Sequence, residues 1–155
     1  MQSVVAALRA REGVRPVWTK ASDPAAWPRF IEAFAGYGAN KFRGEVVAGP
    51  QEPAGMGTEL AIGRGAKGAP FMRARVAWWD PPRGFTLTAS SGGWLSAYHA
   101  TFTLKLSELN EDLTSLELTM KVVFMNRFVE LTSLLLPVAF LYRRRLAKAL
   151  RLLAG

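Results

Sequence analysis

The sequence predicts an α+β domain in which an antiparallel sheet is covered on one face by a long C-terminal helix. Between residues 42 and 122, apolar and polar residues alternate in six short runs separated by turn-forming segments. Such alternation is typical of antiparallel strands that bury one face and expose the other. From residue 127 onward the apolar residues instead recur in steps of three and four, which indicates an amphipathic helix.

The N-terminal region is expected to be helical after an ambiguous beginning. Residues 2–11 suit a strand or a frayed helix, and their pattern does not decide between them. Pro16 favours the first turn of a short helix. Ser22 or Asp23 is expected to cap a second helix that has a proline just inside it and runs to about residue 34. The apolar face of that helix comprises Trp27, Phe30, Ile31 and Phe34.

The six alternating runs follow Gly36 and Gly38, and residues 52–57, 80–84 and 90–93 between them have the composition of turns. One phase of each run is apolar and is expected to face inward. In chain order the inward residues are Phe42, Gly44 and Val46; Leu60 and Ile62; Met72, Ala74, Val76 and Trp78; Phe85 and Leu87; Tyr98, Ala100, Phe102, Leu104 and Leu106; and Leu116, Leu118, Met120 and Val122.

The last helix is predicted over residues 127–153, with a kink at Pro137, which removes one backbone hydrogen bond and crowds the preceding turn. The arginines at 143–145 fall mainly on its outer side. The row expected to face the sheet comprises Phe128, Leu131, Leu135, Val138, Tyr142, Leu146, Ala149 and Leu153.

Composition indicates one globular domain over residues 1–155, without a linker or an internal repeat. The absence of cysteine excludes disulfides and thiolate metal sites. The net charge of +8 suits anionic partners, although a solvated helix face is the simpler explanation. No signal peptide is recognisable, and the longest apolar stretch, residues 131–142, would span roughly 18 Å, short of the ~30 Å hydrocarbon core. We therefore expect a soluble, cytoplasmic protein.

Three groups of residues, taken with the order of the elements, resemble the START-like (SRPBCC) superfamily, in its polyketide cyclase/dehydrase and lipid-transport branch. The resemblance covers residues 3–153. It implies a helix-grip fold: a curved antiparallel sheet of about seven strands, in the order β-α-α-β6-α, wrapped around the last helix. It further implies that residues 2–9 form the first strand and that the interior holds an apolar cavity. The groups are Pro16-Val17-Trp18 with Ser22-Asp23 and Trp27-Pro28-Arg29-Phe30; Gly55 with Gly57; and Val76 with Asp80-Pro81-Pro82-Arg83.

No motif in the sequence predicts a metal or a cofactor. Residues 63–68 match G-x-G-x-x-G, but a strand pattern follows where a dinucleotide site needs a helix, so a hairpin turn is favoured. His99, the only histidine, lies on an outward phase, and the acidic residues are scattered. Arg73 and Arg75 are also predicted to face outward, unless a bulge near residues 78–79 reverses the phase. An inward arginine is typical of cyclase relatives, so this phase argues against cyclase activity.

Aromatic and aliphatic side chains are the main candidates for contact with a ligand. Tyr98 could donate a hydrogen bond, and it is the one candidate for a catalytic role. The alternative is that all these side chains simply fill a close-packed core. The predicted ligand-binding residues are Phe30, Phe34, Trp78, Trp94, Tyr98, Phe102, Met120, Leu135, Val138 and Tyr142.

The first functional hypothesis is binding of a small hydrophobic ligand, lipid-like or polycyclic, in a cavity between the sheet and the last helix. An enzyme of the polyketide cyclase/dehydrase type using the same cavity is the first alternative. A peripheral membrane module is the second, with weak contact to anionic lipid through Arg143, Arg144 and Arg145. Nucleic-acid binding is not expected, because the basic residues are not interleaved with exposed aromatics. The sequence does not decide the oligomeric state, and a homodimer is compatible with it.

Overall fold

The computed structural model describes residues 2–35, 42–64, 70–91, 98–124 and 138–154. It contains one seven-stranded sheet in the order β1-β7-β6-β5-β4-β3-β2, and all neighbouring strands are antiparallel. The strands are β1 Gln2–Ala10, β2 Phe42–Ala48, β3 Glu59–Arg64, β4 Met72–Asp80, β5 Gly84–Ser91, β6 Tyr98–Asn110 and β7 Leu113–Phe124.

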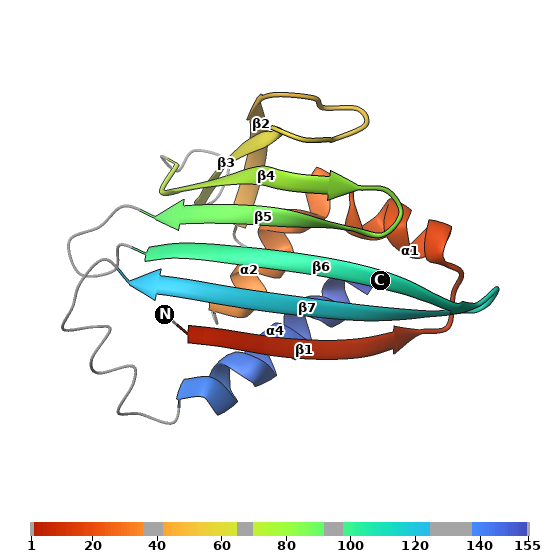
Figure 1. The fold of residues 1–155 in the computed structure, drawn as a ribbon. Coiled ribbons are helices and arrows are strands. Elements are labelled where there is room, and N and C mark those ends of the chain that lie inside the picture. Colours follow the sequence, from red (N-terminus) through yellow and green to blue (C-terminus); the bar gives the residue numbers. More distant parts are fainter. Residues whose placement is uncertain (1, 36–41, 65–69, 92–97, 125–137, 155) are drawn as a thin grey trace.

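The helices lie together on one side of this curved sheet (Figure 1). They are α1 Val14–Ala21, the short 3₁₀ helix η1 Pro24–Ala26, α2 Trp27–Ala35 and α4 Val138–Ala154. The predicted order of elements is confirmed, including the first strand that the family resemblance implied. Each of the six alternating runs is a strand, because side chains that alternate in polarity match the two faces of a pleated sheet.

Of the two predicted caps, Ser22 and Asp23, the cap is Asp23, whose Oδ1 accepts a hydrogen bond from the backbone N–H of Ala25 at 3.0 Å. It caps η1, and α2 begins only at Trp27, so the expected single helix is divided into two elements. The indole of Trp27 donates to the carbonyl of Ala21 at 2.9 Å, which ties α2 to the end of α1.

The core forms between the apolar face of the sheet and the helices. The predicted inward residues of β3 and of β5 to β7 are buried wherever the structure describes their side chains. On α4, the predicted row is confirmed at Leu146, Ala149 and Leu153, which are almost fully buried, and Tyr142 is partly buried. The part of the row from 128 to 135, and the kink predicted at Pro137, lie outside the described residues. Helix α4 approaches α2, β1, β7 and α1 most closely.

The alternation breaks in β4, where a bulge between Val76 and Trp78 makes Ala77 an additional residue. Past the bulge, Trp78 pairs with an outward threonine of β5, and Trp79 pairs with the buried Phe85. A bulge advances the alternation by one residue. The inward phase predicted for Trp78 is therefore wrong, and Trp79 packs against the core in its place.

Two predicted turns are confirmed. The chain reverses after β4, where the N–H of Arg83 donates to the carbonyl of Asp80 at 2.7 Å. Gly57 in the connection from β2 to β3 has φ of +84°, a conformation that glycine adopts without strain. The G-x-G-x-x-G segment joins β3 and β4, which are antiparallel partners, so it lies between two strands and not between a strand and a helix. Among the described residues, no helix is long and apolar enough to cross a bilayer.

Candidate functional site

The inward face of the sheet is apolar across its middle strands. Val76, Leu87, Phe102 and Met120 form one cross-strand row, and each is at most 3% exposed. Among the described side chains, none of the inward sheet positions carries a charge. This face can therefore contact an apolar molecule without stripping water from an ion.

The next row consists of small side chains. Ala74 pairs with Ala89, and Ala89 pairs with Ala100, so three alanines stand side by side on β4, β5 and β6. They are 0%, 1% and 2% exposed. We call these residues the alanine row. Because a methyl group reaches far less above the sheet than leucine or phenylalanine, the row forms a shallow strip beside the larger residues of the preceding row.

Three of the predicted ligand-binding residues lie together beside the alanine row. Phe30 of α2 packs edge-on against Phe102 of β6, with ring centroids 5.1 Å apart and an interplanar angle of 85°. Met120 follows on the neighbouring strand and is fully buried. Edge-to-face contact of this kind is a favoured arrangement of aromatic rings. The contact ties α2 to β6, next to the alanine row.

The other predicted residues are placed less completely. Tyr98 begins β6 opposite Ser91, in phase with Ala100. The backbones of Phe34 and Val138 lie in α2 and α4, and Trp94 and Leu135 fall outside the described residues. Their roles as ligand contacts stay predictions.

Tyr142 is the predicted contact on α4, and its environment is described. Burial raises the pKa of its phenol, and the nearby Arg145 guanidinium partly offsets this effect. The hydroxyl is therefore protonated at neutral pH and can donate a hydrogen bond.

The charged strand residues whose side chains the structure describes face away from the interior. Arg73, Arg75 and His99 are exposed, as predicted, and the bulge in β4 lies beyond both arginines. Arg73 forms an ion pair with Glu59 at 3.1 Å on the outer face.

One buried carboxylate was missed by the sequence reasoning. Glu32 of α2 is 2% exposed, and its Oε2 accepts a hydrogen bond from the backbone N–H of Phe42 at 3.3 Å. This contact links α2 to the first residue of β2. The position is not on the apolar stripe that the helical spacing predicts for α2, so no local signal marks it as buried.

A hollow lies at one end of the sheet, between α1, the β2–β3 connection and the β4–β5 turn. Its volume is about 510 Å³. We call it the tryptophan pocket, because the indoles of Trp18 and Trp79 form part of its wall. Its lining residues are Trp18, Thr19, residues 22–24, residues 51–54, Trp79 and Pro81.

An aromatic cluster stands behind this pocket. The rings of Trp18 and Trp79 meet edge to face, with centroids 5.0 Å apart. Phe85 lies 6.0 Å from Trp18 and 5.8 Å from Trp79, and Trp27 lies 5.4 Å from Phe85. Sequence reasoning did not find this pocket, because its walls come from three separate connections. The adjacent tryptophans of β4 were the available signal.

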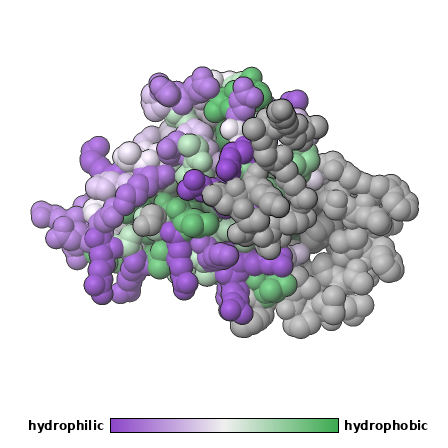
Figure 2. All heavy atoms as spheres, turned by 180° about the vertical axis from the view of Figure 1, so that it is seen from behind, coloured by the Kyte–Doolittle hydropathy of each residue, from purple (hydrophilic) through white to green (hydrophobic). Residues whose placement is uncertain are grey.

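The outer face of α4 is basic. The helix carries five basic residues and no acidic one, and Arg143 and Arg144 are exposed. Leu141 and Leu152 are also exposed, at 45% and 49%. On the helix-bearing side of the molecule, hydrophilic residues surround smaller hydrophobic patches (Figure 2).

Neither protein-family models nor curated proteins match this chain. Solved structures do match it over nearly its whole length. A truncated norcoclaurine synthase from Thalictrum flavum has a TM-score of 0.58 and 14% identity, covering 99% of this chain and 91% of its own. Protein CV1439 from Chromobacterium violaceum has a TM-score of 0.62 and 14% identity, covering 98% and 94%.

A third match is the hypothetical protein jhp0584 from Helicobacter pylori. Its TM-score is 0.70 at 9% identity, and the match covers 99% of this chain and 86% of that one. Similarity of this kind, at such low identity, shows a shared fold and does not assign a function.

Proposed function

From the helix-grip fold of the START-like superfamily, which this chain shares with those structures, we propose that it binds a small apolar molecule, lipid-like or polycyclic. The molecule would lie between the sheet and α4, over the alanine row. The observation that carries the proposal is an inward sheet face that is uncharged at every described side chain and has three adjacent alanines at its middle.

The arrangement of the helices supports this placement. Helix α4 approaches β1 and β7 at one edge of the sheet, and α2 approaches β2 at the other. Among the described residues, neither helix backbone comes as close to β4 or β5, and α2 reaches these strands through the ring of Trp27, which contacts Phe85. Layers in α+β domains pack about 10 Å apart when large side chains fill the space between them. Over the alanine row the sheet contributes only methyl groups, so the sheet itself takes up less of the interlayer space there than at the row of Val76, Leu87, Phe102 and Met120.

The chemistry of the guest follows from the walls. A polar molecule would lose its hydrogen bonds to water and find few partners on this face, which costs several kcal/mol for each group left unpaired. Ser91, on the row next to the alanines, could orient a single hydroxyl or carbonyl. One solved structure of this fold, norcoclaurine synthase, is in complex with dopamine and hydroxybenzaldehyde, so a helix-grip protein can hold small aromatic molecules.

Two measurements on the purified protein test this proposal. Native mass spectrometry should detect a co-purified apolar species, and solvent extraction should remove it. The extracted protein should then bind the neutral probe N-phenyl-1-naphthylamine saturably, with a rise in fluorescence that disappears in denaturing urea. Absence of both a co-purified species and saturable probe binding would overturn the proposal.

We propose contact with an anionic membrane as a second candidate function, because α4 presents exposed leucines beside basic residues that no acidic residue of the helix neutralises. Polybasic segments with apolar neighbours bind anionic lipid. The protein should float with phosphatidylserine vesicles at low salt and stay in solution with phosphatidylcholine vesicles. Replacing Arg143 and Arg144 by glutamine should reduce flotation, whereas the same change at the exposed Arg9 and Arg11 should not. An equal loss of flotation in the variant of α4 and in the control variant would contradict a specific role for α4.

A further inference from the structure

We infer that the tryptophan pocket is a second binding site, selective for an organic cation that carries an ammonium group on an aromatic or aliphatic body. The inference is independent of the proposed interior site, since the pocket lies beside the β4–β5 turn and the β2–β3 connection. Its volume of about 510 Å³ lies within the range of small-molecule sites, roughly 300–1,000 Å³.

The aromatic wall suits a cation. Trp18 and Trp79 line the pocket and are both partly exposed, so their rings can be reached from it. Their orientation is fixed from behind by Phe85 and Trp27, both of which are buried. A cation within about 6 Å of an indole ring is attracted by the ring's electrons, and the attraction is larger for tryptophan than for other aromatic residues. A rigid pair of indoles provides this attraction without reordering of the wall.

The charges around the pocket also favour a cation. The ionisable residues in its lining are Asp23 and Glu52, and no lysine or arginine belongs to the lining. This is notable in a chain whose net charge is +8. Neither carboxylate forms an ion pair within the part of the chain that the structure describes. The pocket is thus a locally acidic site on a basic protein.

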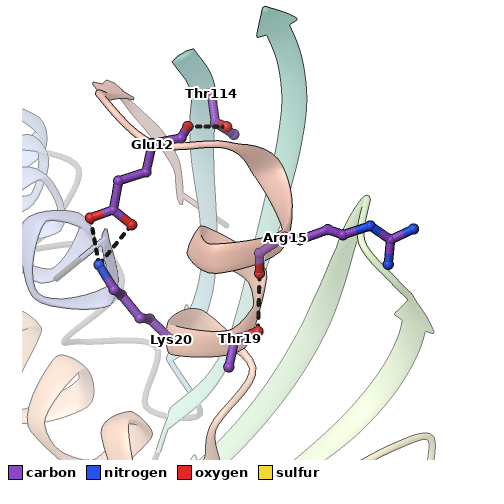
Figure 3. Close-up of polar contacts among 5 residues, drawn as sticks. All are labelled: Glu12, Arg15, Thr19, Lys20 and Thr114. Atoms are coloured by element: carbon purple, nitrogen blue, oxygen red, sulfur yellow. Dashed lines mark hydrogen bonds and ion pairs between the residues drawn. The ribbon is translucent and has the colours of Figure 1, made fainter. Parts of the chain in front are cut away.

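Nearby cations are held by other acids. The ammonium of Lys20 donates to both carboxylate oxygens of Glu12, at 2.6 and 2.7 Å, and Figure 3 shows this pair beside α1. The guanidinium of Arg83 pairs with Asp80 at 2.9 Å. Because these cations already have partners, the carboxylate of Glu52 and the Oδ2 atom of Asp23, whose Oδ1 caps η1, can interact with a ligand. The two carboxylates would repel an anion, and a neutral molecule would be attracted to them less strongly than a cation.

The probe for this site is benzylammonium, compared with benzyl alcohol and benzoate, which keep the ring and change the charge. Indole N–H signals in NMR spectra report the location of binding. Signals of Trp18 and Trp79 should shift with benzylammonium, while Trp27, whose indole donates to Ala21 inside the core, should not. Benzyl alcohol should bind this pocket about tenfold more weakly, and benzoate should not shift these signals.

Neutral variants separate charge recognition from simple contact. Glu52→Gln and Asp23→Asn should each weaken benzylammonium binding about two- to fivefold, since the carboxylates are exposed. Asparagine preserves the cap of η1, so the fold is retained. Glu45→Gln, at an exposed position on β2 outside the pocket, is the matched control and should leave the affinity unchanged.

Three results would overturn the inference. They are equal affinity for benzyl alcohol and benzylammonium, equal effects of Glu52→Gln and Glu45→Gln, and shifts confined to indoles other than Trp18 and Trp79. Failure of the interior proposal would appear differently, as loss of N-phenyl-1-naphthylamine binding with these indole shifts intact.

Discussion

Replacing Ala89 by leucine tests directly whether the space over the alanine row is open. Ala89 is 1% exposed and pairs with Ala74 on one side and Ala100 on the other. A leucine there would extend into the region that we assign to the ligand. Both neighbours in the row are methyl groups, so the new side chain would not be blocked by the sheet itself.

The expected change in the free energy of unfolding has opposite signs for an open and a filled interior. Leucine adds three carbon atoms to the side chain of alanine. At about 0.8 kcal/mol for each buried CH₂, burying them in open apolar space stabilises the fold by about 2 kcal/mol. Forcing the same atoms into a close-packed core costs about 1–3 kcal/mol instead. We expect the first result, since the proposed ligand needs that space.

The assay combines urea unfolding with titration of N-phenyl-1-naphthylamine. Ala89→Leu should raise the unfolding midpoint of the extracted protein and weaken probe binding at least about tenfold, which corresponds to 1.4 kcal/mol. Ala7→Leu makes the same chemical change at an exposed position on β1 and should alter neither quantity appreciably.

Two outcomes would refute the reasoning. A destabilisation of about 1–3 kcal/mol in Ala89→Leu would mean that the core over the alanine row is already full. A stabilised variant with unchanged probe affinity would mean that the space is open but that the probe binds elsewhere.

Three further predictions concern single contacts. Gly84→Ala should destabilise the fold by roughly 2 kcal/mol or more, because the new β-carbon would collide with a backbone carbonyl of β6. Gly55→Ala is the control in the same urea assay. It should have little effect, because its β-carbon would lie 3.7 Å from the nearest atom, in Pro50. Equal effects of the two would refute the collision. Thr114→Val should lower the free energy of unfolding by about 1–2 kcal/mol, because the buried hydroxyl donates to the carbonyl of Glu12 at 2.8 Å. Thr114→Ser keeps this hydrogen bond. A similar loss of stability in both variants would show that the hydrogen bond is not the cause. For Tyr142, burial raises the pKa above the ordinary value of 10.0, so the unfolded chain ionises first and stability falls as the pH rises above 10. Tyr142→Phe should reduce this alkaline loss, measured as urea midpoints at pH 9 and pH 11, and an identical loss in both proteins would contradict it.

Much of the fold was predictable because the signals are local. Alternation along a strand depends only on which face is buried, so Leu60, Leu104 and Leu118 could be assigned to the interior from the sequence alone. The cap at Asp23 was predictable for a similar reason, since a carboxylate before a proline-containing first turn satisfies free backbone N–H groups. Curvature of the sheet and the assignment of residues 2–9 as its first strand came from the family resemblance, whereas the pairing of β1 with β7 was not predicted.

What could not be predicted depends on contacts between distant segments. Glu32 is buried and accepts a hydrogen bond from the backbone N–H of Phe42, ten residues later in the chain, and no pattern within α2 indicates this contact. The tryptophan pocket joins residues near positions 18, 52 and 79, and no spacing within one element relates them. Candidate sites formed by several loops are therefore harder to predict than the strands that support them.

The bulge in β4 links the two proposed sites. Without the bulge, regular alternation along β4 would turn Trp78 inward and Trp79 outward. With it, Trp79 completes the aromatic cluster with Trp18, Trp27 and Phe85 at the end of the sheet that carries the β4–β5 turn. The row of Val76, Leu87, Phe102 and Met120 separates this cluster from the alanine row. The bulge therefore places Trp79 in the wall of the tryptophan pocket, towards the end of β4 that is farther from the alanine row, so the two sites should bind their probes independently.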